Sequence, residues 1–406
     1  MSAVGAAPSV VAARTEQAPW GVFVLVYLLA VTSGAAVGML GPLADQIAVH
    51  LHATQAGVGA SISLVFLPVA LLGTPIGALV DRTGPRMMLL ASGFLLPVAD
   101  GLLLLAPSLS WFAAALLFEG VLIAALMAAG QAMISSVFTG PAQARGLTAW
   151  ATFGFVGFAS GLFLAGLTAA HGYGVALGVH ALVTAVVAIA ALLWLRRRGE
   201  GVELQRPGNP LGLIREVRVI RISLALAIAS TAGVGTNTAI SLYLHQIHHQ
   251  PVSVTASAAA AGNLICILGS LGTGWFLARG LRPIRVAIVV AVVATLAGGA
   301  LYLPWLPFPA TVGLLWTFQV CLSAITGLSY AAMPGVLIDR GRIGAASGLM
   351  MQLSGIGSVA GPPLFFGAMA AGSWQMLVLM VVGMWLVALA LFPKGAARSD
   401  QQAFAP

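Results

Sequence analysis

Long apolar stretches separated by short polar loops run through almost the whole chain. Each stretch has about 20 or more residues, which is enough for a helix to cross the roughly 30 Å hydrocarbon core of a bilayer. The pattern therefore predicts an all-α membrane protein with twelve transmembrane helices. We place these helices near residues 20–44, 53–80, 86–106, 110–138, 146–170, 173–195, 219–244, 253–278, 284–303, 310–338, 345–369 and 374–392.

One long polar stretch divides the predicted helices into two sets of six. Residues 196–218 include RRRGEGVELQRPGNP and predict a cytoplasmic linker between an N-terminal bundle, 20–195, and a C-terminal bundle, 219–392. Residues 1–19 and 393–406 predict cytoplasmic tails. The two sets also resemble each other at an offset of about 200 residues, a weak internal symmetry that is typical of transporters. Thr32 and Gly34, for example, correspond to Thr231 and Gly233.

The positive charges support this helix count. Only 7% of the residues are charged and 60% are apolar, whereas soluble domains have about 25% charged residues. If the N-terminus is cytoplasmic, every Lys and Arg falls on the cytoplasmic side, as the positive-inside rule requires. We therefore expect a multi-pass protein of the bacterial inner membrane with both termini cytoplasmic. These basic residues are Arg14, Arg82, Arg86, Arg145, Arg196, Arg197, Arg198, Arg206, Arg215, Arg218, Arg221, Arg279, Arg282, Arg285, Arg340, Arg342, Lys394 and Arg398.

Other classes of partner find little support in the sequence. The basic loops are explained by topology and anionic lipid, so we expect no nucleic acid. Cys266 and Cys321 lie in apolar spans, where cysteine acts as a small hydrophobe, and we expect neither a disulfide nor a metal site. No G-x-x-x-x-G-K-[ST] loop occurs, and we expect no cofactor. The expected partners are a small-molecule solute, protons and the lipid bilayer, with the protein acting as a monomer.

The loop after the second predicted helix carries the most specific motif. It reads GALVDRTGPRMML and resembles the signature loop of the major facilitator superfamily, G-x-L-A-D-R-x-G-R-K-x-x-L. Pro85 replaces a basic residue of that pattern, and Val80 replaces Ala. The resemblance implies the fold of this superfamily and a secondary transporter that works by alternating access. The matching residues are Gly77, Leu79, Asp81, Arg82, Gly84, Arg86 and Leu89.

The chemistry of this loop favours a close contact between helices beside a fixed negative charge. A small residue at Gly77 allows close helix contact, and Gly84 permits a tight turn. The resemblance implies that Asp81 meets the start of the eleventh helix near Ala345 and stabilises the outward-open state. The alternative for Arg82 and Arg86 is that they only determine topology.

This chain departs from the superfamily pattern at the end of the fourth predicted helix. An acidic residue is often found there, but the chain reads Phe138, Thr139, Gly140. In the second half, Asp339 occupies that kind of place. Arg145 and Arg342 correspond to each other before the fifth and eleventh helices. We therefore predict a charge network that is divided differently between the two halves.

Pairs of glycines mark four predicted helices. The resemblance implies that these helices, the second, fifth, eighth and eleventh, form the contacts between the halves; generic close packing is the alternative. The fifth helix also carries GFASGLFLAG, a degraded form of the antiporter motif G-x-x-x-G-P-x-x-G-G, which indicates export without establishing it. The pairs are Gly73 and Gly77, Gly157 and Gly161, Gly269 and Gly272, and Gly357 and Gly361.

Few ionisable residues lie deep in the spans, and such residues are functional candidates because they are costly there. Glu119 lies about 13 Å from the outer edge of the fourth helix at 1.5 Å per residue. A carboxyl group at this depth could carry a coupling proton, or it could be a structural residue that never titrates. Asp100 lies about 9 Å from the outer edge and ranks lower, with an interfacial position as the alternative. We interpret His180 as structural.

The resemblance implies that the first, fourth, seventh and tenth helices line a central cavity. Thr32, Ser33 and Asn237 could then meet a solute there, together with Trp316 and Gln319. The apolar interiors of the spans lack a Lys or Arg, which transporters of anions commonly need. This favours a neutral or cationic solute, although backbone amides and helix termini can also hold a carboxylate.

The favoured function is therefore secondary active transport of a small organic solute by a proton-coupled rocker-switch. We expect no enzymatic activity and no catalytic residues. Efflux of a drug or metabolite is one form of this function. The alternative is a proton-coupled importer of a small organic acid or a sugar-like metabolite. A non-transporting membrane sensor or a channel belongs to a different class, and a membrane enzyme would need a catalytic constellation that the spans do not indicate.

Overall fold

The computed structural model describes residues 20–198, 210–250, 252–370 and 374–394. This part of the chain consists of α-helices and short 3-10 helices joined by short connections. Most of the predicted tails and residues 199–209 of the predicted linker, with Arg14, Arg206 and Arg398, lie outside the described residues.

The first half of the chain forms one bundle. Its elements are α1 (Trp20–Leu40), α2 (Ala44–His50), α3 (Gln55–Ser63), η1 (Leu64–Phe66), α4 (Leu67–Thr83), α5 (Pro85–Leu104), α6 (Leu109–Val137), α7 (Gly140–Trp150), α8 (Phe153–Thr168), η2 (Ala169–His171) and α9 (Tyr173–Arg198).

The second half forms the other bundle. Its elements are η3 (Pro210–Arg215), α10 (Val217–His248), α11 (Val252–Ile265), α12 (Ile267–Ala278), α13 (Pro283–Leu301), α14 (Phe308–Val336), η4 (Arg340–Arg342), α15 (Ile343–Ala370) and α16 (Trp374–Leu391).

The described residues contain 12 spans that are long and apolar enough to cross a membrane. Spans two, five and eight each consist of two consecutive helices: α3 with α4, α7 with α8, and α11 with α12. At the break between α7 and α8, the Thr152 hydroxyl donates to the carbonyl oxygen of Ala149 at 2.7 Å and is also 2.7 Å from the Tyr27 hydroxyl. Such local bonds compete with the regular helix pattern.

Two predicted boundaries were wrong. The first helix ends at Leu40, and the predicted end at residue 44 falls at the start of the separate short helix α2. The fifth span begins at Gly140 rather than at residue 146. The turn at residues 41–43 is apolar and continues the hydrophobic pattern, whereas the first turns of α7 contain Gln143 and Arg145 and interrupt that pattern although they are helical.

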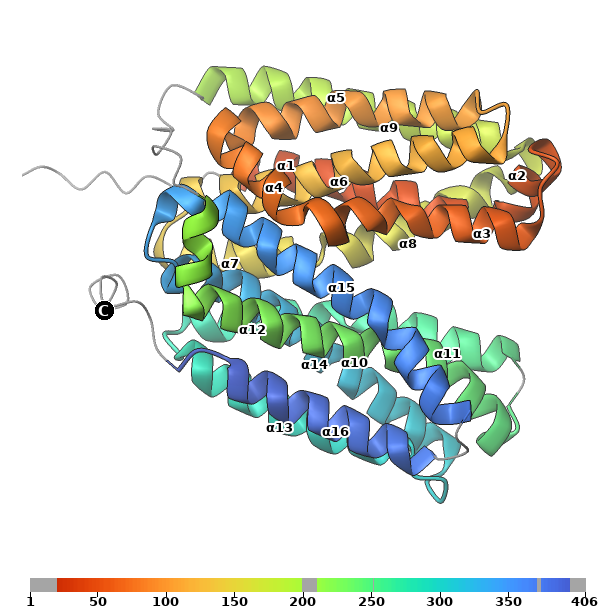
Figure 1. Ribbon diagram of the computed structural model, residues 1–406, viewed down its shortest axis with the longest axis vertical. Helices are drawn as coiled ribbons and strands as arrows, with labels where there is room; N and C mark the ends of the chain where they lie inside the picture. The colour runs from red at the N-terminus through yellow and green to blue at the C-terminus, as the bar shows by residue number, and fades with distance from the viewer. Residues whose placement is uncertain (1–19, 199–209, 251, 371–373, 395–406) are drawn as a thin grey trace, which may run out of the picture.

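The two bundles converge at one end of the molecule and diverge at the other (Figure 1). We call the end at which α1 begins and α16 ends the terminal side. Helix α15 packs along both α4 and α10, and α12 packs on α7, so these helices join the two halves. The described Lys and Arg residues lie in connections or in helix turns next to the terminal side, as expected from the alternating direction of the spans.

Candidate functional site

The carboxylate of Asp81 caps the first turn of α15. The Gly344 N–H donates to Asp81 Oδ1 at 2.7 Å, and the Ala345 N–H donates to Oδ2 at 2.8 Å. The first N–H groups of a helix lack partners within the helix and carry partial positive charge. A carboxylate there accepts their hydrogen bonds and also compensates their charge. This is the contact near Ala345 that the superfamily resemblance implied, and it joins the last turn of α4 to the other half.

The two glycines of the motif lie where the backbone requires them. The backbones of α4 and α15 approach so closely at Gly77 that a side chain there would overlap the main chain of Gly344. Gly84 ends α4 with φ of 89°, a conformation that residues with a Cβ rarely adopt, and its N–H donates to the carbonyl oxygen of Val80 at 2.8 Å. The turn into α5 therefore depends on glycine.

The arginines of the motif play a smaller part in the contacts between the halves. Among the described residues, neither Arg82 nor Arg86 forms an ion pair. At the end of α6, where an acidic partner is missing from the sequence, the Gln143 side chain donates to the carbonyl oxygens of Ser135 at 2.7 Å and Phe138 at 2.9 Å. An amide thus satisfies the free carbonyls of this helix end in place of a charged pair.

The charge network lies in the second half. Arg342 Nε is 3.0 Å from Asp339 Oδ2, and Arg342 Nη1 is 3.8 Å from Glu216 Oε1. The buried Glu216 also accepts a hydrogen bond from the Ile338 N–H at 3.1 Å. Arg145, which corresponds to Arg342 in the sequence, lies instead where α7 approaches Gly274 of α12. Sequence reasoning missed Glu216, whose signal was a lone acid between basic residues before α10.

Further polar contacts between the halves lie on the same side. Gln352 Oε1 accepts from the Thr74 hydroxyl at 2.7 Å, and Gln352 Nε2 donates to the carbonyl oxygen of Leu71 at 3.0 Å. The Ser270 hydroxyl donates to the carbonyl oxygen of Thr148 at 2.6 Å. Sequence reasoning did not single out Gln352, although it is a polar residue within an apolar span.

The glycine pairs divide between two kinds of contact. Gly73 and Gly77 face Gly348 and Gly344 across the boundary between the halves. The other pairs do not, so the alternative of generic close packing holds for them, although α7 and α12 still meet across this boundary. Gly157 and Gly161 pack on α1, Gly269 packs on α14, and Gly357 and Gly361 pack on α10, each within its own half; a Cβ at Gly272 would meet nothing within 4 Å.

Glu119 is a buried acidic residue inside the first half. It lies on α6 with 1% of its surface exposed, and within the described residues neither oxygen of its carboxyl group has a hydrogen-bond partner. A carboxylate without partners at this depth is costly, whereas the neutral acid is tolerated. Glu119 interacts electrostatically with Asp100 and His180.

Asp100 and His180 form a buried pair that ties three helices together. His180 Nδ1 of α9 is 2.8 Å from Asp100 Oδ2 of α5, and His180 Nε2 is 2.9 Å from the carbonyl oxygen of Thr32 on α1. Because a carbonyl oxygen only accepts, Nε2 carries a hydrogen. The neutral form of the pair therefore shares one proton, either as imidazolium and carboxylate or as imidazole and carboxylic acid. Asp100 is 2% exposed, so its carboxyl group is buried within the protein.

Three of the remaining predicted residues, Asn237, Trp316 and Gln319, form a neutral cluster in the second half. Gln319 Nε2 of α14 donates to Asn237 Oδ1 of α10 at 2.7 Å. The Trp316 indole N–H donates to the carbonyl oxygen of Ala258 at 2.9 Å. The Thr32 and Ser33 hydroxyls of α1 instead donate to Leu29 and Ala30 in their own helix. The structure thus places Glu119 in one group and Asn237, Gln319 and Trp316 in another, and among the described residues no hydrogen bond or ion pair joins the two groups.

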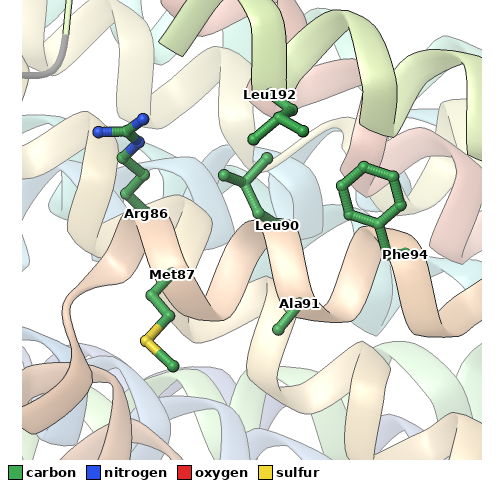
Figure 2. Close-up of a pocket in the computed structure, with 6 residues that line it drawn as sticks. All are labelled: Arg86, Met87, Leu90, Ala91, Phe94 and Leu192. Atoms are coloured by element: carbon green, nitrogen blue, oxygen red, sulfur yellow. The ribbon is translucent and has the colours of Figure 1, made fainter. Parts of the chain in front are cut away.

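A groove of about 500 Å³ lies between α5 and α9 of the first half (Figure 2). Its lining residues are Arg86, Met87, Leu90, Ala91, Phe94 and Leu192. It contains neither Glu119 nor any member of the neutral cluster, so it is separate from the predicted solute site. Within the described residues, no group of three or more His, Cys, Asp or Glu side chains is arranged to hold a metal ion.

Two bundles of six spans, with a carboxylate that bridges them at one end and polar groups buried between apolar helices, define a multi-pass membrane transporter. The profile of the Major Facilitator Superfamily matches residues 26–362, and the chain belongs to this family. A search of curated protein sequences found no match.

Solved structures of transporters share the fold at low sequence identity. The human organic anion transporter MFSD10 (TETRAN) is 16% identical with a TM-score of 0.74, over 93% of this chain and 100% of that chain. The Escherichia coli fucose:proton symporter FucP is 14% identical with a TM-score of 0.73, over 91% and 97%. A bacterial homologue of the iron transporter ferroportin, in an outward-facing state, is 15% identical with a TM-score of 0.70, over 92% and 98%.

Proposed function

We propose that this protein is a proton-coupled secondary transporter of a small organic solute, with a neutral or cationic solute favoured. The observation that carries the proposal is the partnerless carboxyl group of Glu119, buried in a span beside the Asp100–His180 pair. A group that is tolerated as the neutral acid and costly as the anion couples proton uptake to the exposure of its site to water.

The neutral cluster supports a role in solute binding. The Asn237–Gln319 pair leaves an amide N–H donor on Asn237 and the carbonyl acceptor of Gln319, and Trp316 presents an aromatic ring whose N–H is already satisfied. Such a set of groups binds polar organic solutes without a charged partner. Among the proteins of similar fold, FucP is a fucose:proton symporter and MFSD10 is an organic anion transporter, so an importer of a sugar-like metabolite or organic acid is the second candidate.

The contacts between the halves support a specific state. They lie on the terminal side, at Asp81 with Gly344, Thr74 with Gln352, and Thr148 with Ser270. With both termini in the cytoplasm of a bacterium, this arrangement is the outward-facing one, and Asp81 acts as the cytoplasmic gate. Opening toward the cytoplasm requires that α15 leaves the Asp81 carboxylate.

The orientation has a direct test. Single cysteines at the exposed Lys394 and His249 lie at opposite ends of the spans. In intact cells, an impermeant maleimide should label His249→Cys and should label Lys394→Cys only after the membrane is opened. The reverse pattern would overturn the orientation.

Transport itself is tested in proteoliposomes with a panel of amines, sugars, amides and carboxylates. We expect a pH gradient alone to drive uphill movement of at least one solute and the solute to drive proton movement in return. Single-channel currents would favour a channel. Binding of a solute without any flux would favour a sensor.

A further inference from the structure

The groove between α5 and α9 has the position of a lipid site. It lies within spans that cross the membrane, and its lining residues Met87 and Phe94 are 62% and 37% exposed in the protein alone. Leu90 of α5 and Leu192 of α9 face each other across it, as Figure 2 shows. In a bilayer, side chains exposed at this level meet hydrocarbon, so an acyl chain is the matching occupant.

One end of the groove is positively charged. Arg86 lies in the first turn of α5, on the terminal side, and its guanidinium group stands at the end of the row of apolar lining residues (Figure 2). The acid that could have paired with it at the end of α6 is absent, and Gln143 caps that helix end instead. Arg86 has no ion-pair partner among the described residues.

We propose that this groove binds an anionic phospholipid of the leaflet on the terminal side, with one acyl chain between α5 and α9 and the phosphate on Arg86. A guanidinium group binds phosphate oxygens through two parallel hydrogen bonds, and a basic group between spans on the cytoplasmic side selects anionic headgroups. Arg86 follows Gly84 in the loop that begins at Asp81. A lipid bound in the groove would therefore stabilise the first turn of α5, close to Asp81. The proposal of a lipid site is independent of which solute is transported and of whether transport is coupled to protons.

Native mass spectrometry of the purified protein tests this proposal. The protein is mixed with equal amounts of phosphatidylglycerol and phosphatidylcholine in detergent, and the retained lipid is counted. We expect wild type to retain phosphatidylglycerol preferentially and Arg86→Gln to lower that retention about fivefold, as the loss of one favourable basic contact implies. Arg86→Lys should keep most of the phosphatidylglycerol retention of wild type. Ala91→Trp and Leu192→Trp, which fill the groove from its two walls, should each displace the lipid.

The matched control is Arg285→Gln, which removes the same charge from the first turn of α13, the corresponding helix of the second half, and should leave retention unchanged. Thermal unfolding identifies variants that have lost their fold. Equal retention of the two lipids, equal losses in Arg86→Gln and Arg285→Gln, or full retention in both groove-filling variants would each overturn the proposal. Complete displacement of the lipid by inorganic phosphate would also overturn it, because the site would then bind a free anion.

Discussion

The two halves share one helical plan but differ in the polar groups buried within it. The first half contains Glu119, Asp100 and His180, three ionisable groups in electrostatic contact. At the corresponding level of the second half, the structure describes the neutral Asn237–Gln319 pair. Burying an ionisable side chain costs far more free energy than burying an amide. An ionisable residue inside a span is therefore a candidate for a role that depends on its change of protonation. Under the proposed function, proton handling belongs to the first half and solute contacts belong to the second.

The largest effect that we expect concerns the stability of the two buried pairs. His180→Ala leaves Asp100 and the Thr32 carbonyl oxygen without their partner, and we expect a loss of about 3–5 kcal/mol in the free energy of unfolding. Gln319→Ala removes a neutral pair and should cost about 1 kcal/mol. Unfolding of both variants in the same detergent measures the difference.

Asp100→Asn is the matched control for this prediction, because the Asn amide can donate to His180 Nδ1 and keep the pair geometry. We expect it to be closer to wild type than His180→Ala. Equal losses in the free energy of unfolding of His180→Ala and Gln319→Ala would show that the buried pairs of the two halves do not differ in their contribution to stability.

The next effect concerns the gate, where the halves differ again. Asp81 reaches across to α15, whereas Asp339 pairs with Arg342 in its own half. Asp81→Asn loses the charge at the helix N-terminus, worth about 1 kcal/mol, and should shift the balance of states about fivefold toward the inward-open form. Asp339→Asn should shift it less.

Double electron–electron resonance between spin labels on the two halves measures these populations. An unchanged distance distribution in Asp81→Asn would show that the capping contact does not set the balance of states. A larger shift for Asp339→Asn than for Asp81→Asn would place the gate in the second half.

The smallest effect concerns solute binding. Asn237→Ala removes one hydrogen-bonding group from the neutral cluster and should raise KM about fivefold, while the number of protons moved per solute stays at its wild-type value. Initial rates with simultaneous recording of proton flux give both quantities. A changed proton count with an unchanged KM would mean that the second half takes part in coupling.

The sequence predicted the fold and part of the site for specific reasons. Twelve apolar stretches define twelve helical spans, because a helix satisfies its own backbone hydrogen bonds in the bilayer. Asp81 lies in a motif whose spacing is fixed by the α4–α5 turn, and its contact with Ala345 could be expected. Glu119 was visible as a single acid in an apolar span.

Other parts of the site depend on tertiary contacts that the sequence does not reveal. The pairing of Asp100 with His180 requires that α5 packs against α9, and a local pattern gives no such information. The same holds for Gln352, which meets Thr74 only because α15 crosses to α4. The glycine pairs looked alike in the sequence, yet Gly73 meets the other half and Gly157 meets its own. Spacing reports that two helices approach closely, but not which two.

The central claim is that Glu119 carries the coupling proton, and one pair of assays on Glu119→Gln tests it most directly. Gln keeps the shape of the protonated acid but cannot release a proton. Uphill transport driven by a pH gradient should be lost, because a side chain that cannot release a proton cannot couple solute movement to the gradient. Solute exchange at equal pH should continue at close to the wild-type rate. Persistence of both activities, or loss of both, would contradict the account.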